Sequence, residues 1–182
     1  MDINVYLVNE KNQSTRQQVH QFLAQIDQEF VPPLSGRGSS AATNFVASFD
    51  ASRHQLREYV DEIMDQLIIF AQIKMQIVGI FSFKSEYLLA PVIAYSPCNY
   101  ITTIGTHPDF RNFGVGRAMY RFALSALATR YESRYWITRT WSTNKYHLKL
   151  LNQIGFKVVK VLKNDRGVGL HTLYVARPAV TP

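Results

Sequence analysis

The stretch from Asn99 to Leu127 constrains the fold more than any other part of the sequence. It begins with Tyr100 to Thr106, a segment with the composition of a strand, and a turn at residues 107–109 follows. A loop with Gly114 and Gly116 then leads directly into an apolar helical pattern. The first backbone N–H groups of a helix lack partners and lie at the positive end of its dipole, so such a loop suits a phosphate group.

Four explanations of these two glycines have to be compared. A dinucleotide-binding fingerprint requires a third glycine, and Met119 occupies that position. A Walker-type phosphate loop ends in Gly-Lys-Ser/Thr, which is absent here. On this motif alone, a glycine turn into an ordinary packed helix stays open. The absence of Cβ atoms at Gly114 and Gly116, with Arg111 and Arg117 beside them, favours a site for a pyrophosphate.

The overall composition limits the class of protein. With 182 residues, 47% of them hydrophobic, we expect one globular domain over residues 1–182. Apolar runs are short and the N-terminus has no signal-like pattern, so we expect neither a membrane span nor secretion. A single cysteine, Cys98, excludes an internal disulfide and indicates the cytoplasm, and no Cys/His spacing indicates a metal site. The net charge of +7 favours anionic partners.

The periodicity predicts a mixed α/β arrangement with helices on both faces of a sheet. Ser14 is the expected N-cap of the first helix, Asp50 or Ser52 that of the second, and Ser142 or Thr143 starts the last. The segment Leu88 to Tyr95 is apolar enough for a strand, although Pro91 limits it to an edge or a bend. The other expected strands lie at 3–8, 67–73, 76–83, 100–106, 135–141, 156–162 and 168–175, and the helices at about 14–30, 52–67, 115–130 and 142–154.

Two motifs together resemble the GNAT superfamily of acetyl-CoA-dependent N-acetyltransferases. The first is Arg111-Asn112-Phe113-Gly114-Val115-Gly116, preceded by His107-Pro108-Asp109-Phe110. The second begins at Asn144 and ends with Ile154-Gly155-Phe156. Their separation and the order of elements also agree with the family. The resemblance implies a GNAT-like central, mostly antiparallel sheet of six to seven strands flanked by about four helices.

The resemblance also implies which residues hold acetyl-CoA, the cosubstrate. Backbone groups of the strand would contact the pantetheine arm and the acetyl carbonyl, and the loop amides would hold the pyrophosphate. An asparagine at the start of the late helix would bind on the cofactor side, although Asn144 also suits a plain helix start. The implied cofactor-binding residues are Ile104, Gly105, Thr106, Arg111, Asn112, Phe113, Gly114, Val115, Gly116, Arg117 and Asn144.

The sequence departs from the family at the proton donor. Many members carry a tyrosine as general acid where this chain has Leu151. His147 lies one helical turn earlier on the same face and is the candidate catalytic residue, although a packing role is open. Tyr146 points about 100° away and is disfavoured. For the general base, Glu86, His107 and a water relay stay open.

The predicted function is therefore direct transfer of an acetyl group from acetyl-CoA to a primary amine. The alternative is a non-catalytic sensor of acyl-CoA, because Leu151 replaces the usual tyrosine. The acceptor, a small molecule or a peptide, is open, and the net charge slightly favours an anionic one. Aromatic residues suited to a ring-bearing acceptor are Tyr95, Tyr100 and Trp141. Nucleic-acid binding is disfavoured except as a tRNA-linked acceptor. Acyl-chain length and oligomeric state stay open, a homodimer included.

Overall fold

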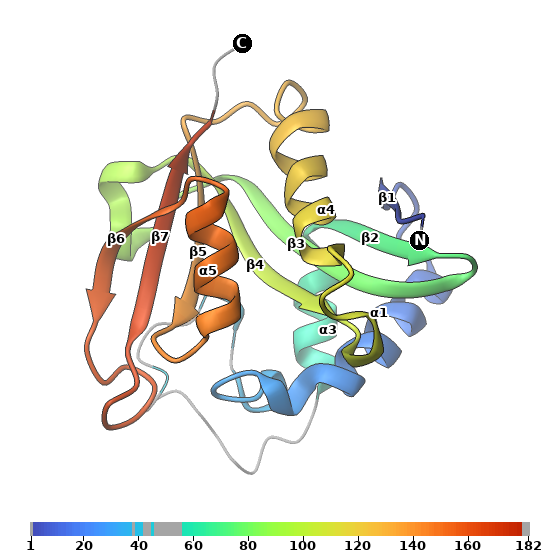
Figure 1. Cartoon of the computed structure of the whole chain (residues 1–182), viewed down its shortest axis with the longest axis horizontal. Helices are drawn as coiled ribbons and strands as arrows, with labels where there is room; N and C mark the ends of the chain where they lie inside the picture. The colour runs from blue at the N-terminus through green and yellow to red at the C-terminus, as the bar shows by residue number, and fades with distance from the viewer. Residues whose placement is uncertain (1, 38, 42–44, 46–55, 180–182) are drawn as a thin grey trace.

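A seven-stranded sheet forms the centre of the molecule in the computed structural model, which describes residues 2–37, 39–41, 45 and 56–179 (Figure 1). The strand order is β1-β2-β3-β4-β5-β7-β6, and β4 and β5 alone form a parallel pair. The strands are β1 Asn4–Leu7, β2 Leu67–Ile73, β3 Gln76–Tyr87, β4 Cys98–Thr106, β5 Tyr135–Trp141, β6 Lys157–Leu162 and β7 Thr172–Pro178. The α-helices described are α1 Gln13–Ile26, α3 Leu56–Met64, α4 Val115–Arg121 and α5 Lys145–Gln153. This confirms the expected mixed, mostly antiparallel α/β fold.

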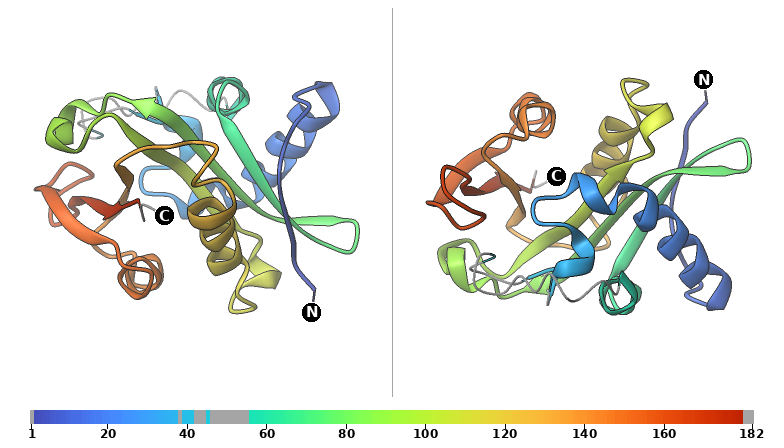
Figure 2. Two further views of the ribbon diagram at one scale, coloured as in Figure 1. Left: turned by 90° about the horizontal axis from the view of Figure 1, so that it is seen from above. Right: turned by 90° about the horizontal axis from the view of Figure 1, so that it is seen from below.

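Helices cover both faces of the sheet, with α1 and α3 on one face and α4 and α5 on the other (Figure 2). The alternation of side chains along each strand makes this possible. In β2, for example, Ile68 and Phe70 belong to the apolar cluster with α1 and α3, whereas Ile69 belongs to the cluster with α4. In the part of the chain that the structure describes, no helix is long and apolar enough to span a membrane.

Several helix ends differ from the sequence-based expectation. The N-cap of α1 is Asn12 rather than Ser14, because the Asn12 side chain accepts a hydrogen bond from the Thr15 amide at 3.0 Å. α1 ends at Ile26, and α4 continues as a π-helical turn over Phe122–Ala126. The caps expected at Asp50 or Ser52 lie outside the described residues.

The segment Leu88 to Tyr95, expected as an edge strand or a bend, does not form a strand. Residues Ala90–Tyr95 form 3₁₀ turns with Pro91 at a helix start. Proline has no N–H to donate to a ladder, and its fixed φ suits the first turn of a helix, which explains the difference. The apolar residues of the segment still reach a core, because Leu89 and Val92 are buried with Cys98.

β4 and β5 pair over a short distance and then separate. Their register runs only from Asn99↔Trp136 to Ile101↔Thr138. Beyond it, a bulge in β4 leaves Thr102 out of register with β3. The remaining residues of β4, up to Thr106, therefore keep their antiparallel partner β3 but have none in β5. The backbone groups of β4 that face β5 are available to a ligand.

Candidate active site

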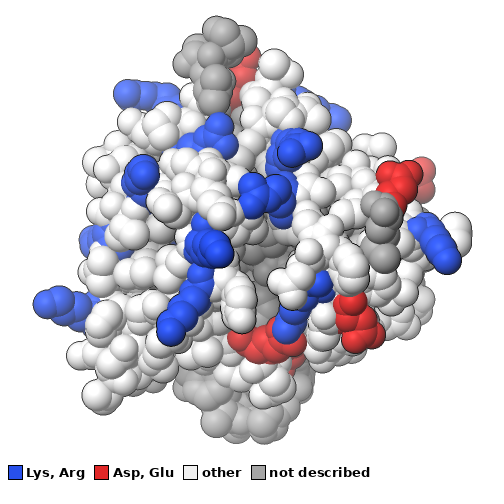
Figure 3. Space-filling model, in the orientation of Figure 1, with Lys and Arg blue, Asp and Glu red and all other residues white. Residues whose placement is uncertain are grey.

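A cavity of about 790 Å³ opens where β4 and β5 diverge. Figure 3 shows the hollow on the face that carries α4 and α5, with Lys and Arg side chains around it. Its walls come from β4, the loop into α4, α5, β5, the segment after α1 and the turn between β6 and β7. Its described lining contains one acidic residue, Glu29, and six basic residues: Arg37, Arg111, Arg117, Arg139, Lys149 and Arg166.

The structure brings together almost all of the residues that the sequence assigned to the cofactor. The cavity-lining members are Ile104, Gly105, Thr106, Arg111, Asn112, Gly114, Val115, Gly116, Arg117 and Asn144. Phe113 is the exception, because it is not part of the lining and is 54% exposed. A role for these residues in binding a cofactor stays a prediction.

The loop before α4 has the backbone geometry of an anion cradle. Gly114 is the N-cap of α4 and has a φ of 84°, in the left-handed region that glycine adopts without strain. Asn112 has a φ of 66°, which asparagine tolerates better than most residues. No side chain caps the helix at Gly114, so the first amides of α4 are available to an external acceptor.

Gly105 is required by packing within the fold. A Cβ atom at this position would collide with Cδ1 of Ile26, the last residue of α1. Both residues line the cavity. The close approach of α1 to β4 therefore fixes one wall of the site, and the sequence alone did not reveal this role.

The basic side chains near the loop are already engaged with neighbours. The Arg111 guanidinium forms an ion pair with Glu29, just after α1, and both side chains are more than 40% exposed. Arg117 donates to the Gln153 side chain of α5 at 2.5 Å. Exposed pairs of this kind contribute only about 0–1 kcal/mol, so an incoming phosphate can displace them.

Asn144 and His147 lie at the start of α5. The Asn144 side chain is the N-cap and accepts from the His147 amide at 3.3 Å. The helix therefore starts later than the Ser142 or Thr143 expected from sequence. Asn144 also lines the cavity, so the capping role and a contact to a ligand are compatible.

His147 is half-buried in the cavity wall between two hydroxyl groups. Its Nε2 lies 2.8 Å from the Tyr120 hydroxyl, and its Nδ1 lies 3.3 Å from Thr140 Oγ1. Burial lowers the pKa of His147 to about 4, so the imidazole is neutral at physiological pH. A neutral imidazole donates from one nitrogen and accepts at the other, which allows this chain of three groups to pass a proton.

The other candidates for proton transfer occupy different environments. Leu151 is 1% exposed and packs in the core against α4. Tyr146 lines the cavity although it is 86% exposed, so its offset around the helix does not remove it from the site. Glu86 is exposed and His107 is the N-cap of a short turn, and neither lines the cavity.

Of the three aromatic residues expected near the acceptor, only Trp141 lines the cavity. Tyr100 is fully buried and stacks on Tyr87, and Tyr95 packs edge-on against Tyr135. Cross-strand packing explains Tyr100, and packing of the 3₁₀ turn on β5 explains Tyr95.

Sequence reasoning missed a group of three buried arginines at the cavity. Arg37, Arg139 and Arg166 are 7%, 9% and 8% exposed, and all three guanidinium groups lie over the ring of Phe45. We call these three residues the arginine cluster. They come from the segment after α1, from β5 and from the β6–β7 turn, so no local pattern could have indicated them.

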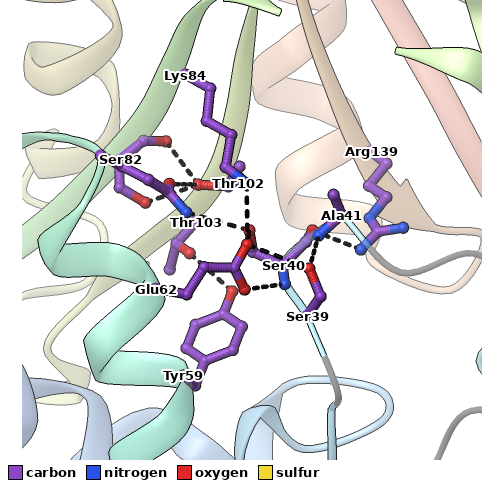
Figure 4. Close-up of polar contacts among 11 residues, drawn as sticks. Ser39, Ser40, Ala41, Tyr59, Glu62, Ser82, Lys84, Thr102, Thr103 and Arg139 are labelled. Atoms are coloured by element: carbon purple, nitrogen blue, oxygen red, sulfur yellow. Dashed lines mark hydrogen bonds and ion pairs between the residues drawn. The ribbon is translucent and has the colours of Figure 1, made fainter. Parts of the chain in front are cut away.

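A polar network fixes one member of the arginine cluster (Figure 4). The Glu62 carboxylate, on α3, accepts from the Ser40 amide and hydroxyl at 2.6 Å each and from Lys84 Nζ at 2.9 Å. The Ser40 carbonyl in turn accepts from Arg139 at 2.6 Å. Burial would raise the pKa of Glu62, but the hydrogen bonds from Ser40 and Lys84 bring it below its ordinary value.

Comparison with known proteins identifies the family. Residues 38–156 match the model of the acetyltransferase (GNAT) family, and no curated protein matches the sequence at a significant level. Many solved structures share the fold, which is all that identities this low can show. One is an aminoglycoside 6'-N-acetyltransferase in complex with coenzyme A, with 13% identity, a TM-score of 0.64 and coverage of 100% of this chain and 99% of that one.

Two further structures have the same fold. The ribosomal-protein-S18-alanine N-acetyltransferase from Escherichia coli is 12% identical, with a TM-score of 0.65 and coverage of 100% of this chain and 96% of that one. A GNAT-family acetyltransferase from Bacillus cereus ATCC 10987 is 14% identical, with a TM-score of 0.66 and full coverage of both chains. The family match spans well over half of the sequence and includes both motifs around the cavity. The chain therefore belongs to the GNAT family of acetyltransferases.

Proposed function

We propose that this protein transfers an acetyl group from acetyl-CoA to a primary amine. The observation that carries the proposal is the cavity between the diverging ends of β4 and β5, into which the glycine turn and first amides of α4 open. Family membership and the coenzyme A bound to one structural neighbour support it. Residues 1–182 are proposed to act as one domain.

The donor set fits acetyl-CoA. The amides at the start of α4, together with Arg111 and Arg117, would bind the pyrophosphate. The β5-facing backbone groups of residues 104–106 would pair with the amides of the pantetheine arm. Asn144 would add a side-chain hydrogen bond from α5.

Bound acetyl-CoA supplies an acetyl thioester whose carbonyl carbon forms a bond to the amine nitrogen while its bond to sulfur breaks. The residues of the cavity hold the two reactants together, which accounts for much of the rate. A free N–H of β4 stabilises the charge on the carbonyl oxygen. The amine proton passes to water, and the sulfur takes up a proton through His147.

His147 is proposed as the catalytic residue for that last step. Its neutral imidazole would give a proton to the sulfur from one nitrogen as the other nitrogen takes up the proton that the amine released to water. The Tyr120 hydroxyl, 2.8 Å from Nε2, holds the ring in place. Burial raises the pKa of Tyr120, so this hydroxyl keeps its proton and contributes a hydrogen bond to the ring.

The deciding experiment measures release of free thiol from acetyl-CoA with a panel of amines, amino sugars and peptides. We expect amine-dependent thiol release and a rise in melting temperature with saturating acetyl-CoA, because a ligand at 100 times its Kd stabilises by about 2.7 kcal/mol. A melting shift without thiol release on any amine would favour the alternative, an acyl-CoA sensor. No melting shift would contradict both.

A further inference from the structure

The arginine cluster is the strongest concentration of buried positive charge around the cavity, and the proposed chemistry does not use it. The Phe45 ring lies 5.1 Å from Arg37, 4.4 Å from Arg139 and 4.4 Å from Arg166, measured from ring centroid to Cζ. The three charges therefore lie within about 10 Å of one another, a distance at which buried like charges repel.

Burial and this repulsion lower the pKa of two members. Burial, and then the charge of Arg139, lowers the pKa of Arg37 to about 10. Burial, and then the charges of Arg37 and Arg139, lowers the pKa of Arg166 to about 9. The charge of Asp165 opposes the second shift without reversing it. All three arginines remain charged at neutral pH, so the fold keeps together charges that an anion would stabilise.

Hydrogen bonds to backbone and side-chain oxygens hold the three guanidinium groups of the cluster in place. Arg37 donates to the Pro32 carbonyl at 2.9 and 2.7 Å, and Arg166 donates to Thr172 Oγ1 at 2.8 Å and to the Val31 carbonyl. Arg139 is held by the Ser40 carbonyl (Figure 4). The bonds of Arg37 and Arg166 use part of each guanidinium fork, and all three arginines line the cavity. A second anionic oxygen acceptor can therefore meet preorganised donors.

The members of the cluster come from elements other than the loop into α4. They lie on β5, in the segment after α1 and in the β6–β7 turn, and Arg166 joins the latter two by donating to the Val31 carbonyl. The loop into α4 has its own basic residues in Arg111 and Arg117, with Lys149 on α5. Phe30 and Trp141 flank the cluster, at 5.3 Å from Arg37 and 5.6 Å from Arg166.

We propose that the arginine cluster binds an anionic group, a carboxylate or a phosphate, on the amine acceptor and so selects acidic amines as substrates. This inference rests on the proposed function, because it assigns the cluster to the acceptor. It adds three specificity-determining residues to the cavity. Glu62, which holds Ser40 and through it Arg139, is the positioning residue of the cluster.

The test titrates the full chain, saturated with CoA, by calorimetry with three small amines: 2-aminoethyl phosphate, β-alanine and 2-aminoethanol. We expect at least one of the anionic amines to bind about 10-fold or more tightly than the neutral one, since a charge-assisted hydrogen bond is worth that much. The stronger of the two anions identifies phosphate or carboxylate as the recognised group.

Substitutions at Arg166 test whether the arginine cluster causes the preference for anionic over neutral amines. Arg166→Gln removes one charge and should reduce the preference for the anionic amine about 10-fold, and Arg166→Lys should retain part of it. Arg121→Gln is the matched control, because Arg121 is exposed on α4 and does not line the cavity. The affinity for acetyl-CoA should stay within about 2-fold in all three variants.

Equal affinity for the neutral and anionic amines, or no binding of either anion, would overturn the proposal without any variant. A preference that survives in Arg166→Gln, or an anion that displaces CoA, would also overturn it. These outcomes concern binding alone. Failure of thiol release with every amine would instead contradict the proposed function. The calorimetric comparison of the anionic and neutral amines would still test the arginine cluster.

Discussion

Nε2 of His147 and the hydroxyl of Tyr120 lie 2.8 Å apart and join α5 to α4 beside the cavity. Tyr120 is fully buried, and its ring packs edge-on against Phe81 at 5.4 Å. This pair therefore anchors the candidate catalytic imidazole to the core of the sheet. Its burial has a consequence for stability that can be measured without knowing the substrate.

Stability should depend on His147 between pH 6.5 and about 4. A histidine with the ordinary pKa of 6.5 in the unfolded chain takes up its proton before the folded one, whose pKa is about 4. The unfolded state thus binds more protons in this range, and the free energy of unfolding falls as the pH is lowered, by on the order of 2 kcal/mol for a half-buried group. Urea unfolding at a series of pH values should show this slope in the wild type and lose it in His147→Gln.

The exposed His20 provides the control, since His20→Gln should keep the wild-type slope. The same low pKa predicts that kcat/KM has no inflection from His147 near pH 6.5. An inflection at that pH that disappears in His147→Gln would contradict the assigned protonation state.

Gly114→Glu should weaken acetyl-CoA binding by about 30-fold or more, because it adds a negative charge where the pyrophosphate is proposed to bind. Gly169→Glu is a close control: Gly169 also has a positive φ, of 77°, and a Cβ atom there would also meet nothing within 4 Å. Both variants therefore carry the same backbone strain and the same charge. Calorimetry with equal loss of affinity in the two variants would refute the loop assignment.

Gly105→Ala should destabilise the protein by about 1–3 kcal/mol, because the new methyl group overlaps Cδ1 of Ile26. Ile26→Val removes that Cδ1 atom. The double variant should therefore be more stable than the sum of the two single changes, with a coupling of about 1 kcal/mol in urea unfolding. Strict additivity would mean that α1 moves away from β4 instead.

Glu29→Gln should raise the affinity for acetyl-CoA about 2- to 5-fold, since it releases Arg111 and removes the one acidic side chain of the described lining. Asp109→Asn, at an exposed position outside the lining, should have a smaller effect. The difference should shrink in high salt, because exposed charges are screened. A tighter complex with Asp109→Asn than with Glu29→Gln would argue against this reading.

Glu62→Gln should lower the free energy of unfolding at pH 7 by about 1–3 kcal/mol, because the carboxylate accepts from Ser40 and Lys84. The folded pKa of Glu62 lies below its ordinary value of 4.5, so its contribution is present above that pH and lost as the pH falls through the folded pKa. Wild type and variant should therefore converge in acid. Glu86→Gln, an exposed carboxylate on β3, should change little at either pH.

The loop residues that line the cavity could be predicted because they are local in sequence. Gly114 and Gly116 stand next to the helix that they open, and β5 has the bounds expected from its pattern, Tyr135–Trp141. The N-cap of α1 was placed wrongly because the Asn12 side chain, two residues before Ser14, caps the helix. Ala90–Tyr95 forms 3₁₀ turns in spite of its apolar pattern because Pro91 favours a helix start.

The arginine cluster could not be predicted because it is assembled by tertiary structure. Arg37, Arg139 and Arg166 are far apart in the chain and meet only over Phe45. Tyr146 was set aside by helical geometry alone, and the width of the cavity brings it into the lining. A net charge of +7 indicated an anionic partner but not which residues would bind it.

The divergence of β4 and β5 also has a mechanical consequence. Three residue pairs between β4 and β5 join the two parts of the sheet, and we call these pairs the seam. One part, or leaf, has the four strands β1 to β4, and the other leaf has the three strands β5 to β7. A ligand that bonds to both strands beyond Ile101 and Thr138 would extend this seam and tie the leaves together. Binding would then slow hydrogen exchange in strands that the ligand never touches, because opening of the seam exposes both leaves at once.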